Sequence, residues 1–522
     1  MIGSARTAGR GGGATPFGFD TGQGGVDTAG TGMPSTDGDP PPRPERKTPA
    51  LTDESGAARM SPARTDTHPD AGDPRILALL ARIGASGPDA QQPTPLDLQG
   101  VDLRGLGLGR TALGEQARTG TPPVWWDGQQ DGLRLAGADL REATLEETDL
   151  RGANLTGADL SGVLGRSAHF DGAALEEADL GGADLSGAHF TAMAGGEANF
   201  DEAMLEDARF GQASMRFAKL RRALLDGADF TGTDLWGADL TGADADYTVF
   251  RGTRLDEAKL GNVNLTYADF EGASLKKANL AGSRLRGANF TGVKLDGANL
   301  DGADFSETSL VRLNLSTCSL RHVRFAGAWL NGTRMRAEQL GGAVGEEIAK
   351  EYKAAQASYL ALEQNFKSIG AQDEASWAYK RGRRMGRFHA GTEARAAWRA
   401  RSGRDLARHG YQWVADRFVE WLCDYGESLS RIARAFVLVI GLFAALYGVA
   451  GGLIREGGDG SPTYNVLDLV SYSALNMMTA NPPEIGIKPI GRFTNLLVGI
   501  EGAVGIILMG LFGFILGNRL RR

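Results

Sequence analysis

Few side chains of this 522-residue chain have the types and spacing that chemistry requires. The six histidines form no HExxH motif, and the chain contains neither a GxxxxGK[ST] phosphate loop nor a GxSxG nucleophile elbow. Cys318 and Cys423 lie far apart and in no CxxC pattern, which excludes a disulfide scaffold and a cysteine-based zinc site. The sequence therefore predicts no catalytic residue, no cofactor and no metal, and a protein that is not an enzyme.

One pair of histidines has a spacing that draws notice. His169 and His189 lie 20 residues apart, and each directly precedes a phenylalanine. Two imidazoles could begin a metal site, but two ligands alone rarely suffice, and outward-facing histidines are usually solvated. Solvation is the favoured interpretation of this pair.

A five-residue repeat occupies the middle of the chain and must set the positions of all other groups there. Every fifth residue from 135 to 340 is Leu, Phe or Met, except Gly165, Gly195 and Ala245. Neither a helical period of 3.6 nor strand alternation gives a period of five, so the repeats must stack into a solenoid. The 75 glycines and only 7% aromatic residues fit a structure with many turns.

Triplets such as Ala138-Asp139-Leu140 and Ala158-Asp159-Leu160 resemble the pentapeptide-repeat family, which folds as a right-handed quadrilateral β-helix. Phenylalanines recur every 20 residues, as expected if four pentapeptides make one turn: Phe170, Phe190, Phe210, Phe230, Phe250, Phe270 and Phe290. About ten turns spaced by about 4.8 Å would give a rod on the order of 50 Å long. Four earlier repeats, centred on Leu98, Leu103, Leu108 and Leu113, run in another phase before an insert at 114–130. The β-helix is therefore predicted over 96–345.

The segments before and after the repeats differ from them in composition. Residues 1–72 contain almost no apolar side chains and are predicted to be disordered, and 73–95 is predicted to form a short helix that caps the repeats. Residues 346–432 are predicted to form a helical hairpin and a basic linker. Its arginines are expected to contact anionic lipid: Arg381, Arg383, Arg384 and Arg387.

Two apolar stretches, 435–454 and 494–516, are long enough to cross a bilayer as helices, and both are placed in a pore module over 433–522. Basic residues precede the first and follow the second, which predicts a multi-pass protein of the cell inner membrane with both termini in the cytoplasm. Residues 465–479 lie between them and are too short to span, so they are predicted to form a re-entrant helix.

This layout resembles the two-span potassium-channel module. Residues 421–428 and 352–384 also resemble the helical linker that joins pentapeptide repeats to such modules in a bacterial family. The resemblance implies a homotetramer in the lipid bilayer that admits monovalent cations. The predicted fold is therefore a pentapeptide-repeat β-helix, an α-helical linker and an all-α two-span pore module.

The loop that would select the ion departs from the channel pattern TxGYGD. The filter-equivalent residues are Thr479, Ala480, Asn481, Pro482, Pro483 and Glu484. Each proline fixes φ near −65°, so the carbonyl cage is not expected to form and the pore is predicted to lack potassium selectivity. Glu501, in the first turns of the second span, is expected to face protein or water, and Gly510 and Gly513 would let neighbouring spans approach or bend.

The predicted function is an ion-channel-like membrane protein whose cytoplasmic rod senses or recruits an unknown protein or ligand. One alternative keeps the membrane topology but makes the protein a non-conducting scaffold. Another is a DNA-mimicking repeat protein that binds DNA gyrase, because residues 131–210 hold 17 acidic and 5 basic side chains. Residues 211–345 hold 15 and 17, so the acidic field does not continue, and nucleic acid is not an expected partner.

Overall fold

The computed structural model describes residues 74–75, 78–79, 98–104, 126–127, 132–457, 460–479 and 485–520. The chain divides into two units, Met1–Pro42 and Arg43–Arg522, and every described residue belongs to the second. The predicted disordered tail lies outside the described residues. Of the predicted cap at 73–95, residues 74–75 and 78–79 are described as helical, and Leu79 is buried in the hydrophobic core.

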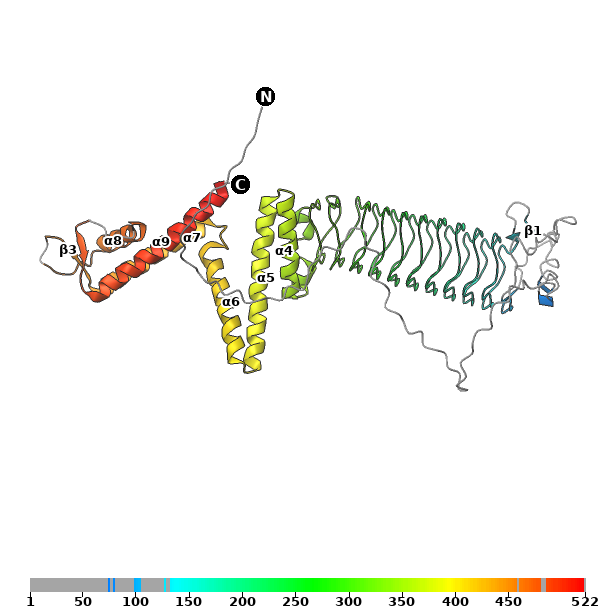
Figure 1. The fold of residues 1–522 in the computed structure, drawn as a ribbon, viewed down its shortest axis with the longest axis horizontal. Coiled ribbons are helices and arrows are strands. Elements are labelled where there is room, and N and C mark those ends of the chain that lie inside the picture. The colour runs from blue at the N-terminus through cyan, green and yellow to red at the C-terminus, as the bar shows by residue number, and fades with distance from the viewer. Residues whose placement is uncertain are drawn as a thin grey trace, which may run out of the picture. The chain divides into compact units, whose positions relative to one another are not determined.

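The repeats form a β-helix of stacked turns (Figure 1), and each turn has four sides. Isolated parallel bridges join residues 20 positions apart, and one turn carries four of them, at Asp139, Thr144, Asp149 and Asn154. The predicted turn of four pentapeptides is therefore confirmed. Almost every pentapeptide bends at a residue with positive φ, such as Gly232 at 70°, and this requirement explains much of the glycine content.

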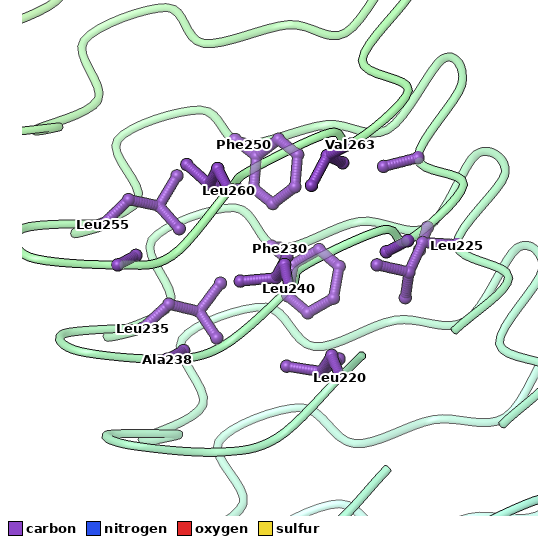
Figure 2. Close-up of a cluster of buried hydrophobic side chains, with 14 of the residues drawn as sticks. Leu220, Leu225, Phe230, Leu235, Ala238, Leu240, Phe250, Leu255, Leu260 and Val263 are labelled. Atoms are coloured by element: carbon purple, nitrogen blue, oxygen red, sulfur yellow. The ribbon is translucent and has the colours of Figure 1, made fainter. Parts of the chain in front are cut away.

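The centre of the β-helix is filled by the residues of the five-residue period. The phenylalanine rings stack along one face, with centroids 4.6 Å apart between Phe210 and Phe230 and 5.3 Å apart between Phe230 and Phe250. Figure 2 shows Phe230 and Phe250 on successive turns. Buried threonines occupy some of the small positions, and the Thr253 hydroxyl donates to the Phe230 carbonyl at 2.7 Å. The core therefore consists of apolar side chains together with a few buried hydroxyl groups, each of which has a hydrogen-bond partner.

The earlier repeats stack on the first turns in spite of their different phase. Leu98 and Leu103 are buried, and their N–H groups donate to the carbonyls of Asp139 and Thr144 at 2.7 and 2.9 Å. Leu108 and Leu113 lie outside the described residues. Of the insert at 114–130, strand β1 (Trp126–Asp127) is described and pairs antiparallel with β2 (Gly132–Leu133).

A helical region follows the repeats. It contains the 3-10 helix η1 (Ala337–Leu340), α3 (Gly345–Ile348), α4 (Tyr352–Ser368), α5 (Gln372–Arg399) and α6 (Gly403–Cys423). Helices α4 and α5 pack together across a turn at Gly370, whose φ is 79°. Tyr359 of α4 is buried with its ring edge against Trp377 of α5, at a centroid distance of 5.5 Å.

The C-terminal region contains α7 (Leu429–Ala450), β3 (Leu453–Arg455), α8 (Val466–Thr479), β4 (Ile487–Pro489) and α9 (Arg492–Leu520). The first predicted span, about 435–454, lies in α7 except for its last four residues. The Ser428 hydroxyl accepts a hydrogen bond from the Arg431 N–H, so the helix begins earlier, at Leu429. It ends at Ala450 because Gly451 turns into the left-handed region, and the following residues form β3, which pairs antiparallel with β4.

Candidate functional site

Helices α7 and α9 are long and apolar enough to cross a membrane. Only 28% and 33% of their most apolar windows are buried within the chain, whereas a core helix of a soluble protein would be mostly buried. Large apolar side chains point away from the chain on both helices, including Val437 of α7 and Phe514 of α9. This surface needs an apolar surrounding that the described chain does not supply.

The short helix α8 packs on both of these helices. One of its faces is buried and carries Leu469, Tyr472, Ser473, Asn476 and Met477. The Tyr472 ring stands at 90° to the ring of Tyr447 of α7, with centroids 5.6 Å apart. The opposite face, with Leu467 and Met478, is exposed and apolar.

Glu501 of α9 ties the three helices together. Its carboxylate accepts hydrogen bonds from the Tyr447 hydroxyl of α7 at 2.7 Å and from the Asn476 amide of α8 at 2.8 Å, and also from the Ser473 hydroxyl. The side chain is completely buried. Glu501 faces protein, one of the two surroundings expected for it, because donors from two other helices enclose the carboxylate.

Sequence reasoning missed the three donors to Glu501. A lone acid in an apolar stretch implies a partner, but nothing in the sequence shows which polar residues of the other helices will reach it. Ser473 and Asn476 are three residues apart in an apolar segment, so they lie on the same face of a helix. This spacing is the one feature of the sequence that indicates a shared polar contact for them.

The glycines of α9 fall on two different faces. A Cβ at Gly505 would lie 2.1 Å from the Met477 carbonyl oxygen, so this glycine is required for the close approach of α8. A Cβ at Gly510 or Gly513 would meet nothing within 4 Å. The latter two glycines therefore do not serve packing within the described part of this chain.

The filter-equivalent loop begins at the C-terminal end of α8. Thr479 is the last residue of that helix, and its exposed hydroxyl donates to the Leu475 carbonyl at 2.7 Å. Ala480, Asn481, Pro482, Pro483 and Glu484 lie outside the described residues. The β3–β4 ribbon flanks the segment that contains α8 and the loop, and an ion pair between Arg455 and Asp468 at 2.7 Å joins β3 to α8.

The basic residues of α5 have partners inside the linker. Arg381 pairs with Glu347 at 2.7 Å, and Arg383 pairs with Asp416 at 2.6 Å. Arg384 and Arg387 both pair with Glu420 of α6. These ion pairs hold α5 against α3 and α6, and they give the four arginines a role inside the linker that the sequence did not indicate.

The Glu420 carboxylate is the centre of the α5–α6 contact. Its burial alone would raise its pKa, but the hydrogen bonds and charges of Arg387 and Arg384 outweigh the desolvation and hold the pKa below its ordinary value. The carboxylate thus stays ionised, and the linker helices are joined by charge as well as by apolar packing.

Comparison with known proteins identifies the repeats. The family described as pentapeptide repeats matches in 8 copies, over residues 132–164, 166–192, 196–232, 223–262, 253–292, 264–302 and 298–336. Residues 132–336 are pentapeptide repeats. The match ends where η1 begins, so the helical linker and the C-terminal helices follow the pentapeptide-repeat domain rather than belonging to it.

Several solved structures are similar to the pentapeptide-repeat domain. HetL, a pentapeptide repeat protein involved in heterocyst differentiation regulation in the cyanobacterium Nostoc, is 28% identical; the match covers 47% of this chain and 95% of that chain, with a TM-score of 0.32. QnrB1, a plasmid-mediated fluoroquinolone resistance protein, is 25% identical over 38% of this chain and 96% of its own, with a TM-score of 0.17. A pentapeptide repeat protein of the Arabidopsis thaliana thylakoid lumen is 25% identical over 21% and 65%, with a TM-score of 0.11. No curated protein matches the chain.

The last turns of the pentapeptide-repeat domain are capped by side chains of α3 and α4. Glu346 is fully buried, and one carboxylate oxygen accepts from the N–H groups of Phe325 and Ala326, both at 2.9 Å. The Asn365 amide imitates a further rung of the ladder, because it accepts from the Thr333 N–H and donates to the Thr333 carbonyl, each at 3.0 Å. The linker therefore closes the open edge of the β-helix.

Proposed function

We propose that this protein is a channel-like membrane protein in which four copies enclose a pore, and in which the pentapeptide-repeat domain lies in the cytoplasm and biases the state of that pore. The C-terminal helices supply the pore walls, α8 lies at membrane depth without spanning, and the loop from Thr479 to Glu484 lines the narrowest point. Both termini are placed in the cytoplasm, and the membrane is the cell inner membrane.

The observation that carries this proposal is the attachment of α8 by Glu501. A helix of 14 residues cannot span a bilayer, and a segment of this kind is stable at membrane depth only where protein or a water-filled cavity surrounds it. The hydrogen bonds from Tyr447, Ser473 and Asn476 hold α8 between two membrane-length helices. A plain membrane anchor would have no need of such a tethered half-helix.

A single chain cannot complete the arrangement. The face of α8 that carries Leu467 and Met478 is exposed, as is the face of α9 that carries Gly510 and Gly513. Packing between copies would cover these faces, because small residues let neighbouring membrane helices approach closely. A ring of four copies follows from the resemblance to two-span potassium channels.

The direction of α8 favours a cation at the loop. The helix ends at Thr479, and the free carbonyl groups of a helix C-terminus carry partial negative charge. The prolines at 482 and 483 remove the backbone freedom that a potassium filter needs. We therefore expect monovalent cations to pass without a strong preference for potassium.

The test is a current measurement across a planar bilayer that contains the purified protein, with potassium on one side and sodium on the other. The proposal predicts discrete openings with a reversal potential near zero. The double variant Pro482→Ala, Pro483→Ala should change the unitary conductance, and the control Pro462→Ala, in the same connecting segment but outside the loop, should not. Strong potassium selectivity would overturn the reasoning about the loop.

The competing membrane function is a non-conducting scaffold. Persistent silence in the bilayer, from a preparation in which tetramers are confirmed by native mass spectrometry, would favour it. The scaffold would use the same pentapeptide-repeat domain to recruit a cytoplasmic partner, and the experiments would then turn to that partner.

The gyrase-binding alternative rests on the acidic residues between 131 and 210. Ion pairs interrupt that charge, for example between Arg141 and Asp139 at 2.6 Å and between Arg151 and Asp149 at 2.7 Å. A supercoiling assay with the whole protein in detergent tests this alternative. Inhibition of gyrase at micromolar protein would favour it, and the absence of inhibition would dismiss it.

A further inference from the structure

The turns of the pentapeptide-repeat domain place two histidines and an aspartate together on its outer surface. His169 and His189 are bridge partners on adjacent turns, and their ring centroids lie 4.5 Å apart. Asp171 follows in the bend after His169, with its Oδ2 atom 3.6 Å from His169 Nδ1. One potential ligand atom from each residue lies within 4.8 Å of the other two, a gathering found among the described residues.

The backbone of the β-helix sets the positions of the two histidine side chains. Each histidine precedes a core phenylalanine, so strand alternation directs its imidazole outward. The rings of Phe170 and Phe190 stack beneath at 5.0 Å, and the Phe170 N–H donates to the His189 carbonyl at 2.7 Å. The spacing between the two imidazoles is therefore set by the ladder and not by two freely moving side chains.

Asp171 is also held in place. Its Oδ1 atom accepts a hydrogen bond from the Thr191 N–H of the next turn at 3.0 Å, which leaves Oδ2 turned toward His169. Ligand carboxylates in metal sites are commonly oriented by such a second hydrogen bond. The sequence indicated the two histidines but not Asp171, because the bend that brings Asp171 beside them is visible only in the folded turn.

We propose that His169, His189 and Asp171 bind a divalent transition-metal ion of the Zn²⁺ class. Two imidazole nitrogens and one carboxylate oxygen suit Zn²⁺, which is bound at about 2.0–2.2 Å in a tetrahedron whose ligand atoms are about 3.3 Å apart. The present separations exceed that value by at most about 1.5 Å. The side chains of His169 and Asp171 are 40% and 27% exposed, so rotation about their side-chain bonds can close the difference.

The two histidines lie between an acidic residue on the preceding turn and a basic residue on the following turn. Asp149 is the bridge partner of His169 on the preceding turn and is held by Arg151, whose guanidinium donates two hydrogen bonds to it, at 2.7 and 2.9 Å. Arg209 is the bridge partner of His189 on the following turn. Asp149 therefore remains outside the ligand set, and the fourth position of the ion is left for water or for a side chain of a partner protein.

A bound ion would join two successive turns and would offer that open position to the solvent at the surface of the domain. This inference does not depend on the pore proposal, because the site lies wholly within the pentapeptide-repeat domain. It gives the domain a defined ligand, which could be the signal that the protein senses or the means by which it recruits a partner.

The test uses the full-length protein without a histidine tag, treated with chelator and then titrated with Zn²⁺ against a chromophoric competitor. We expect one tight Zn²⁺ per chain. Each of His169→Asn, His189→Asn and Asp171→Asn should weaken that binding at least about tenfold. The control His409→Asn, in α6, should bind as the wild type does.

Two further readouts use only the wild-type protein, so a misfolded variant cannot leave the question open. Co²⁺ should show the strong visible absorption of a four- or five-coordinate site, and Zn²⁺ should slow amide exchange in residues 168–192, since an ion that binds only the folded turns stabilises them. Absence of binding at micromolar Zn²⁺, the weak spectrum of aqueous Co²⁺, or full binding by all three variants would each overturn the proposal.

Discussion

Replacing Glu346 by alanine should open the end of the pentapeptide-repeat domain where it meets the linker. The carboxylate is the shared acceptor of the Phe325 and Ala326 N–H groups, and both donors would lose it, the first at a buried residue and the second at a half-buried one. A buried donor without a partner costs about 1–3 kcal/mol, so two donors cost about 2–6 kcal/mol. Water that enters the vacated space reduces this cost, which places the expected value toward the lower end.

The assay is hydrogen exchange followed by mass spectrometry on peptides that contain Phe325 and Ala326. A loss of about 2 kcal/mol of local stability corresponds to exchange about 30-fold faster. Glu346→Gln is the matched control, because its side-chain carbonyl can still accept both hydrogen bonds. Exchange in Glu346→Ala as slow as in the wild type, in a protein that remains folded, would refute the assignment of Glu346 as the cap.

The same junction should respond to pH. Burial raises the pKa of Glu346, although hydrogen bonds from Ser358 and the backbone oppose the rise. Because the pKa is higher in the folded than in the unfolded chain, the contribution to stability is full below the unfolded value and is lost as the pH rises through the folded value. Amide exchange at Phe325 and Ala326 should therefore accelerate as the pH rises from the unfolded pKa of Glu346 through its folded pKa, after correction for the intrinsic pH dependence of exchange. Glu346→Gln should lack this acceleration.

Two further predictions concern the core and the membrane helices. Phe230→Ala removes a ring stacked between Phe210 and Phe250 and should destabilise the β-helix by about 3–5 kcal/mol. The control Leu224→Ala, at a position 40% exposed, should change the stability by about 0.5 kcal/mol or less. Urea unfolding, followed by the β-sheet infrared band, measures both free energies. Gly505→Ala places a Cβ 2.1 Å from the Met477 carbonyl oxygen and should lower the yield of monodisperse protein in detergent. The control Gly499→Ala, also in α9, adds a Cβ that meets nothing within 4 Å and should preserve the yield. Equal yields for the two glycine variants would contradict the packing of α8 on α9.

The β-helix could be predicted closely because its determinants are local and repeated. The phenylalanines at intervals of 20 already implied four pentapeptides in a turn, and the rings of Phe210, Phe230 and Phe250 stack accordingly. The same rule failed to show the metal-site candidate, since Asp171 reaches His169 through the shape of a bend and not through the five-residue period.

The candidate membrane site was less accessible from sequence because its contacts join residues far apart in the chain. In the membrane helices, the Glu501 carboxylate accepts a hydrogen bond from the Tyr447 hydroxyl; in the linker, Arg387 pairs with Glu420. The sequence shows these polar groups but does not show which of them meet. The apolar run from 435 to 454 appears continuous, yet Gly451 ends the helix and the ribbon of β3 and β4 replaces its last turn. Which glycine ends a helix is decided by the tertiary contacts of the residues that follow it, and these contacts are not visible in the sequence.

The bridges between residues 20 apart also determine how this chain can change in length. Deleting 20 residues would remove one whole turn, leave each side chain above its former type of neighbour, and bring the surface at His169 nearer to the Glu346 cap by about 4.8 Å. Deleting only five from the middle of the domain would move every later residue to the adjacent face, so the cap and the last turns would rotate together by about a quarter of a turn relative to the first turns. The pentapeptide is thus the unit of the sequence, but the turn of four pentapeptides is the unit in which the protein can be shortened or extended while its two ends keep their orientation.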